Sequence, residues 1–130
     1  MTTPATITVV LPTSHLLNLN AERRMHHHER ARIVKHIRTE VAGLAASITP
    51  LTSPVAIRVT YRWPDRHRRD SIVGNWTPLE KAAVDGLVDA GVIVDDSDAH
   101  VTQYVRGPNH LGGISPGYAA LTVSVEEVRE

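Results

Sequence analysis

Apolar and polar residues alternate along several segments of the chain in the way that predicts β-strands with one buried face. The clearest case is residues 55–63, where every odd position is Val, Ile, Tyr or Trp and the even positions are Ala, Arg or Thr. Residues 6–11 are rich in β-branched side chains, and residues 118–125 alternate in the same manner. A fourth strand is predicted over residues 100–106, followed by a long Gly- and Pro-rich turn over residues 107–117.

Two other segments have helical periodicity. Within residues 26–46 the apolar positions recur at spacings of three and four, and these are Ile33, Ile37, Val41 and Leu44, with Ala45 beside them. A second helix is predicted from Thr77, which suits an N-cap, with Glu80 completing a capping box. Gly91 is suited to the position just after its C-terminus.

The resulting element order, β–α–β–loop–α–β–β, predicts an α/β or α+β fold with a small mixed sheet and two main helices. A chain of 130 residues suits one domain, residues 1–130. No apolar run approaches the roughly 20 residues that a membrane helix needs, and the N-terminus lacks the features of a secretion signal. The chain has no Cys, which excludes a disulfide framework and thiol catalysis. We therefore expect a cytoplasmic protein without membrane contacts.

A formal net charge of zero conceals separate basic and acidic blocks. Residues 23–38 and 58–69 are rich in Arg, whereas residues 80–98 carry six acidic side chains against a single lysine. Such a distribution favours a surface for a polyanion beside an acidic site. The simpler alternative is that each block is a solvated face.

The segment from residue 65 to residue 96 combines the residue types that phosphodiester hydrolysis needs. An Arg-rich run ends in Asp70, the predicted helix carries Lys81, and Asp95 and Asp96 follow that helix. Carboxylate oxygens are the ligands that Mg²⁺ prefers, and a carboxylate-held Mg²⁺ activates water. Neighbouring arginines could hold phosphates. From the residues alone, an ion pair between Asp70 and an adjacent arginine is the simpler interpretation.

Some other side chains have ordinary structural interpretations. Lys81 and Asp85 are four residues apart on one helix face, which predicts a surface pair in which Asp85 orients the lysine. The run at residues 26–28 is three histidines, but consecutive positions at a helix start are not expected to share a face. We expect one of them to pack or to contact phosphate. Trp63 and Trp76 are expected to anchor the core or a lid rather than to stack on bases.

Two parts of this segment together resemble a known family. Residues 68–70 read RRD, and residues 81–96 read KAAVDGLVDAGVIVDD. An Arg-rich run ending in Asp, a nearby Asn, a helix that opens on Lys-Ala, and then Ala-Gly and a closing Asp-Asp are similar to the RusA family of Holliday junction resolvases. These are crossover junction endodeoxyribonucleases, commonly carried by phages and prophages. The resemblance is strongest over residues 62–106 and is consistent near the N-terminus.

The resemblance implies a dimeric, Mg²⁺-dependent nuclease, with Mn²⁺ as a possible substitute, that resolves Holliday junctions and other branched DNA by symmetric nicking in recombination and repair. It implies catalytic roles for Asp70, Lys81 and Asp96, and metal binding by Asp70, Asp96 and Asp95. It also implies that the protein works in the cytoplasm of a bacterium or a phage-infected cell. The residues expected to contact DNA, taken from the resemblance and from the basic blocks, are Arg66, Arg68, Arg69, Asn75, Arg23 and Arg24.

The sequence departs from the family pattern at one position. The best-known members have a second aspartate two residues after the first, and this chain has Ile72 there. A catalytically impaired protein of the same fold that binds branched DNA is therefore an alternative. A more distant alternative is a structural or partner-binding phage protein, which would have no salt-dependent affinity for DNA.

Overall fold

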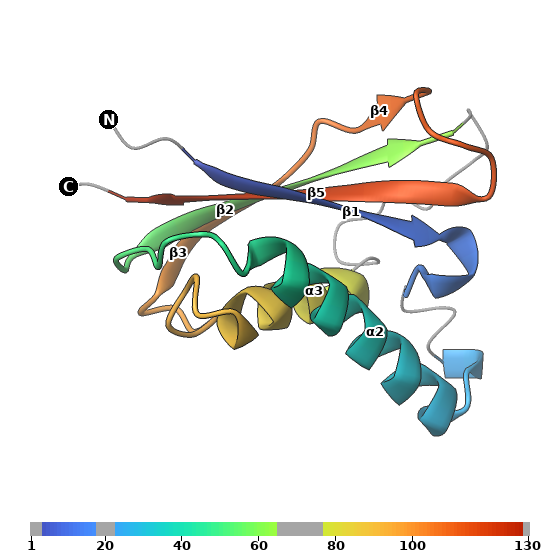
Figure 1. The fold of residues 1–130 in the computed structure, drawn as a ribbon, viewed down its shortest axis with the longest axis horizontal. Coiled ribbons are helices and arrows are strands. Elements are labelled where there is room, and N and C mark those ends of the chain that lie inside the picture. Colours follow the sequence, from blue (N-terminus) through green and yellow to red (C-terminus); the bar gives the residue numbers. More distant parts are fainter. Residues whose placement is uncertain (1–3, 18–22, 65–76, 129–130) are drawn as a thin grey trace.

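The computed structural model describes residues 4–17, 23–64 and 77–128, and these form one β-sheet with two helices on a single face (Figure 1). The elements are β1 (Ala5–Pro12), a 3₁₀ turn (Thr13–His15), α2 (His27–Ala45), β2 (Val55–Trp63), α3 (Thr77–Asp89), β3 (Val101–Arg106), β4 (His110–Leu111) and β5 (Tyr118–Glu127). The predicted strands and helices are all present, close to their predicted bounds.

The sheet is mixed, with strand order β1-β5-β2-β3 and with β4 paired to the end of β2. β5 lies antiparallel to both β1 and β2, whereas β3 and β4 run parallel to β2. Parallel neighbours need a crossover connection, and here α3 lies in the connection from β2 to β3. The α+β fold class predicted from the sequence is confirmed. β4 is a difference, because it lies inside the segment predicted to be one long turn.

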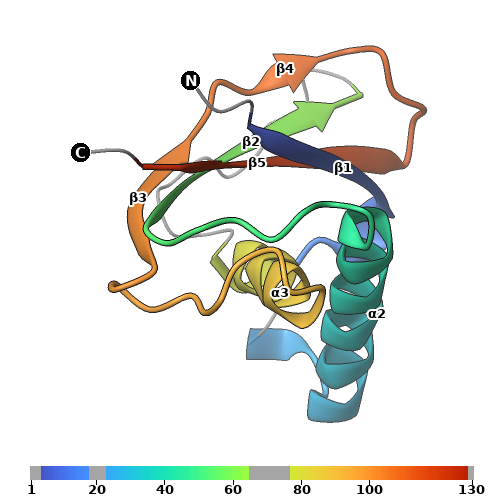
Figure 2. The ribbon, with the colours of Figure 1, turned by 60° about the vertical axis from the view of Figure 1, so that its left-hand side comes forward.

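One face of the sheet is apolar and the other is polar, as the alternation of residues along the strands predicted. Apolar side chains on the inner face of β1, β2 and β5 are buried against α2 and α3, which lie on that side in both views (Figures 1 and 2). The outer face carries hydroxyl pairs between β1 and β5, with Thr6 hydrogen-bonded to Ser124 (3.1 Å) and Thr8 to Thr122 (2.9 Å). Trp63 is buried in the core, as expected.

Helix α2 contacts the core through a row of residues four apart. Its buried side chains are Ile33, Ile37, Val41 and Ala45. The prediction placed Leu44 in this row, but Leu44 is 46% exposed. The row continues from Val41 to the next position four residues on, which is Ala45, so Leu44 falls on the solvent side.

Helix α3 ends as the sequence predicts. Gly91 has a φ of +78°, and its N–H donates to the carbonyl of Val88 at 3.0 Å, while Val92 N–H donates to the carbonyl of Leu87 at 3.0 Å. This pair of bonds is the Schellman motif, which favours glycine because its left-handed conformation is strained for other residues. The turn fixes the direction of the loop that carries Asp95 and Asp96.

The two helices approach each other most closely at Gly86 of α3. A Cβ atom built on Gly86 would lie 2.7 Å from Val41 Cβ and 2.9 Å from the carbonyl oxygen of Arg38. Only glycine fits there without a shift of α2. Within the described residues, neither helix has the length and apolar content needed to span a membrane.

Candidate active site

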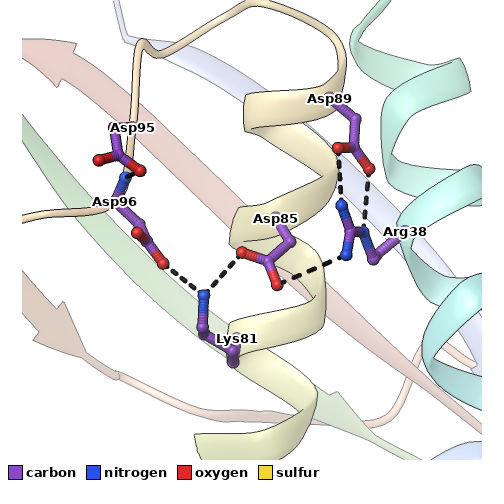
Figure 3. Close-up of polar contacts among 6 residues, drawn as sticks. All are labelled: Arg38, Lys81, Asp85, Asp89, Asp95 and Asp96. Carbon is purple, nitrogen blue, oxygen red and sulfur yellow. Dashed lines mark hydrogen bonds and ion pairs between the residues drawn. The ribbon is translucent and has the colours of Figure 1, made fainter. Parts of the chain in front are cut away.

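Lys81 and Asp96 meet at the first turns of α3, as Figure 3 shows. Lys81 Nζ donates to Asp85 Oδ1 at 2.8 Å and to Asp96 Oδ2 at 2.5 Å. The contact with Asp85 follows from helical spacing and confirms the predicted surface pair. The contact with Asp96 depends on the turn at Gly91, which returns the chain toward the start of the helix. The structure therefore brings together two of the three residues predicted to be catalytic.

The Asp95 carboxylate bonds to the backbone of its own loop instead of contacting Lys81. Its Oδ1 accepts a hydrogen bond from the backbone N–H of Asp96 at 2.8 Å. In Figure 3 the Asp96 side chain extends toward Lys81, whereas that of Asp95 does not. Asp95 therefore holds the backbone of the loop in the conformation that presents Asp96.

The same lysine belongs to a row of alternating charges between α3 and α2 (Figure 3). Beyond Asp85, the guanidinium of Arg38 lies 4.0 Å from the Asp85 carboxylate and forms two hydrogen bonds to Asp89, at 3.0 and 2.8 Å. Arg38 was part of the basic block considered for polyanion binding. In the structure its charge is matched by α3, so it is less suited to bind phosphate.

These contacts favour the charged forms of both Lys81 and Asp96. The hydrogen bond from Lys81 lowers the pKa of Asp96 below its usual value. Hydrogen bonds to Asp85 and then to Asp96 raise the pKa of Lys81. The Lys81 side chain is nevertheless 58% exposed. At neutral pH it is an accessible ammonium group that can meet a phosphate oxygen.

A pocket of about 170 Å³ opens beside this pair. Ile57, Val84 and Val101 contribute apolar surface to it, while Lys81 and Asp96 contribute charge. An apolar wall with a few charged groups strengthens electrostatic contacts to a bound ligand, because it lowers the local dielectric.

Glu80 also lines the pocket, and its position corrects the sequence analysis. Its side chain is 2% exposed and accepts hydrogen bonds from the hydroxyls of Tyr61 and Tyr104, both at 2.7 Å, and from Arg106 Nε at 2.8 Å. The capping box predicted that the Glu80 carboxylate accepts from the backbone at the start of the helix. That prediction is wrong, because the carboxylate instead accepts from side chains on β2 and β3. Burial, reinforced by the Glu80 charge, raises the pKa of Tyr61 and of Tyr104. The alternation over residues 55–63 places Tyr61 on the inner face, and no comparable pattern indicated Tyr104.

Most of the remaining predicted site residues fall in a segment that the structure does not describe. Asp70, Arg66, Arg68, Arg69 and Asn75 lie outside the described residues, as do Ile72 and Trp76. Arg23 and Arg24 are exposed and precede the N-terminal end of α2 (Figure 1). Among the contacts of the described residues, none joins either arginine to Lys81 or Asp96.

The three consecutive histidines do share a face, contrary to prediction. The rings of His26, His27 and His28 lie with centroids 4.1 to 5.0 Å apart, and their ligand nitrogens are all within 4.8 Å of one another. The helical-spacing argument fails because His26 is the N-cap, with a ψ of 141° outside the helical range. In the described part of the chain no other group of three such side chains converges this way. The positive end of α2 opposes a cation there, so we assign none.

Comparisons with known proteins agree with the family resemblance. Over 96 residues, which are 74% of this chain, the sequence is 35% identical to the crossover junction endodeoxyribonuclease RusA of Escherichia coli K12, covering 69% of that protein. The enzymes named RusA from Shigella sonnei and from Enterobacteria phage 82 are each 34% identical over the same length and the same shares of both chains. No family model matches the chain. All three relatives are by name endodeoxyribonucleases of crossover junctions. The chain belongs to the RusA family.

Proposed function

We propose that this protein is a structure-specific endodeoxyribonuclease that nicks branched DNA, above all four-way junctions, with the help of a divalent cation. The observation that carries the proposal is the contact between Lys81 and Asp96 beside a pocket, in a chain whose relatives are named for cutting crossover junctions. The two residues are 15 positions apart, so their pairing is a product of the fold.

The donor set suits a hard cation. The carboxylates of Asp95 and Asp96 offer oxygen ligands of the kind that Mg²⁺ takes, with Mn²⁺ as an alternative, and we infer that Asp70 completes the set. When bound, the cation supplies charge neutralisation at the phosphate and an activated water. Lys81 donates to a non-bridging phosphate oxygen and stabilises the charge that develops there. Asp85 orients the Lys81 ammonium, and Asp95 holds the loop that presents Asp96.

The symmetry of a four-way junction favours a homodimer as the active assembly. A four-way junction has two equivalent strands to be cut, and a homodimer with a two-fold axis would present two equivalent sites to them. We propose that Arg66, Arg68, Arg69, Asn75, Arg23 and Arg24 contact DNA around each site, in the cytoplasm of a bacterium or a phage-infected cell.

The test is nicking of a synthetic four-way junction, labelled on each strand, at increasing Mg²⁺ concentration. Wild type should nick two opposite strands. Asp96→Asn should lower the nicking rate by about 10²-fold or more while junction binding persists, because a neutral amide is a poor ligand for a hard cation. Asp89→Asn is the matched control, since it makes the same charge change next to Arg38 and away from Lys81. Equal activity of the two variants would remove Asp96 from the site.

Ile72 supports a second candidate function, that of a DNA-binding protein with impaired catalysis. Salt-dependent junction binding without nicking in either Mg²⁺ or Mn²⁺ would favour it. Absence of any salt-dependent affinity for DNA would instead favour a partner-binding protein.

A further inference from the structure

A buried carboxylate lies against the pocket that Lys81 and Asp96 line. Glu80 is 2% exposed and receives three hydrogen bonds, one of them from the charged guanidinium of Arg106. The proposed hydrolysis does not use either residue. Burial of a carboxylate costs free energy unless a charged partner and hydrogen bonds compensate for the lost water, and an apolar side chain at position 80 would avoid that cost. A role in ligand binding would explain why Glu80 and Arg106 are charged at this position.

The Arg106 guanidinium contacts Glu80 through Nε and lies over the Tyr104 ring, while its two Nη groups have no partner among the described residues. Its Nε is 2.8 Å from Glu80 Oε1, and its Cζ lies 5.1 Å from the centroid of the Tyr104 ring. The Arg106 side chain is 33% exposed and lines the pocket. Within the described structure, no hydrogen-bond partner is found for its two Nη groups.

Arg106 balances the charge of the side chains that line the pocket. The described charged residues of the pocket are two acids, Glu80 and Asp96, and two bases, Lys81 and Arg106. Lys81 is already shared between two carboxylates. Without Arg106 the described side chains of the pocket would be net acidic, and a phosphate would depend on the bound divalent cation alone for charge neutralisation.

We infer that Arg106 is a phosphate-binding residue of the DNA site, which Glu80 and Tyr104 position to hold a phosphodiester next to the one that Lys81 contacts. A guanidinium with a free Nη edge forms paired hydrogen bonds to phosphate oxygens, and fixing its plane beforehand reduces the entropy lost on binding. Glu80 acts through Arg106 and is a positioning residue. This role presupposes the proposed nuclease function and adds a specific DNA contact to it.

The test is the salt dependence of junction affinity for the double variant Glu80→Gln/Arg106→Gln, measured without divalent cations. The double variant leaves the net charge of the protein unchanged, and the new amide accepts from one tyrosine hydroxyl and donates to the hydroxyl oxygen of the other. Loss of one phosphate contact should reduce the slope of log K against log salt by about one unit and weaken binding roughly tenfold near 0.1 M salt. Arg58→Gln is the control, because Arg58 lies on the outer face of β2 and donates to the carbonyl of Gly107. Its slope should match wild type.

Arg106→Lys guards against a folding defect, because it keeps a cation beside Glu80. A lysine still neutralises a phosphate but lacks the paired donors, so affinity should fall several-fold while the slope is retained. Wild-type affinity in both Arg106 variants would overturn the inference, as would an equal loss in Arg58→Gln. If wild type binds and nicks junctions while the Arg106 variants are unaffected, only the Arg106 role fails. If wild type does not bind junctions, the proposed function itself fails.

Discussion

Gly86→Ala should destabilise the protein, although the same change in an unhindered helix stabilises. In a helix interior, Ala is favoured over Gly by about 1 kcal/mol. At Gly86, however, the new Cβ would lie 2.7 Å from Val41 Cβ, 2.8 Å from Val41 Cγ1 and 2.9 Å from the Arg38 carbonyl oxygen. Neither a Cβ nor a backbone carbonyl can rotate away, so α2 and α3 must separate. Overpacking of this kind costs ~1–3 kcal/mol, which exceeds the helix-propensity gain over most of that range, so we expect a net loss of up to about 2 kcal/mol in the free energy of unfolding.

Gly43→Ala is the matched control on the partner helix. A Cβ on Gly43 would meet no atom within 4 Å, so this variant should gain roughly 0.5–1 kcal/mol. Urea denaturation of both variants gives the free energies, and thermal melts should move in opposite directions by a few degrees per kcal/mol.

Val41→Ala provides a second check on the proposed clash. Added to Gly86→Ala, it removes the Val41 Cγ1 contact, so the double variant should be more stable than the sum of the two single changes predicts. Unchanged or increased stability of Gly86→Ala would refute the reasoning, whereas strict additivity with Val41→Ala would assign the clash to Val41 Cβ and the Arg38 carbonyl alone. Separation of the helices would also shift Lys81, so we expect junction nicking by Gly86→Ala to fall with its stability.

Further predictions concern the site and its neighbours. Lys81→Met should lower junction nicking by about 10²-fold with little change in thermal stability, since Lys81 is a largely exposed cation; normal nicking would exclude it from the chemistry. Asp70→Asn should abolish nicking in the strand-cleavage assay and preserve binding in a gel-shift assay. Ile72→Asp should lower the Mg²⁺ concentration needed for nicking if it restores a lost ligand, and an unchanged requirement would contradict that. The pKa values of Tyr61 and Tyr104 are raised by burial and a neighbouring carboxylate, so the unfolded chain ionises first. The contribution of these two tyrosines to the free energy of unfolding should therefore be constant below pH ~10 and be lost above it, so the alkaline loss of stability should be less steep in the Phe variants.

The sequence was informative wherever one local rule decided the structure. Alternation located the long strands, and the glycine at position 91 marked the end of α3 correctly. The i, i+4 rule predicted the contact between Lys81 and Asp85. These features depend on residues within a few positions of one another, and so they can be predicted from a single sequence.

Features that depend on distant partners were missed. Glu80 was assigned to a local cap because its donors, Tyr61 and Arg106, are 19 and 26 residues away and belong to two strands. Arg38 was read as free positive charge because its partner Asp89 is 51 residues away on another helix. The pairing of Lys81 with Asp96 was expected only through the family resemblance, since no periodicity relates those positions.

The position of β5 has a consequence for the synthesis of the protein. Among the described strands, β5 (Tyr118–Glu127) comes last in sequence order, yet it lies between β1 and β2 and pairs with both. A nascent chain elongated to residue 117 already contains Lys81, Asp96 and Arg106, but β1 has no neighbouring strand and the apolar face that supports the helices is incomplete. The sheet closes only after β5 leaves the ribosome and inserts at its centre. A chain that has not yet reached β5 therefore lacks the central strand of the sheet on which the site-bearing helix α3 packs.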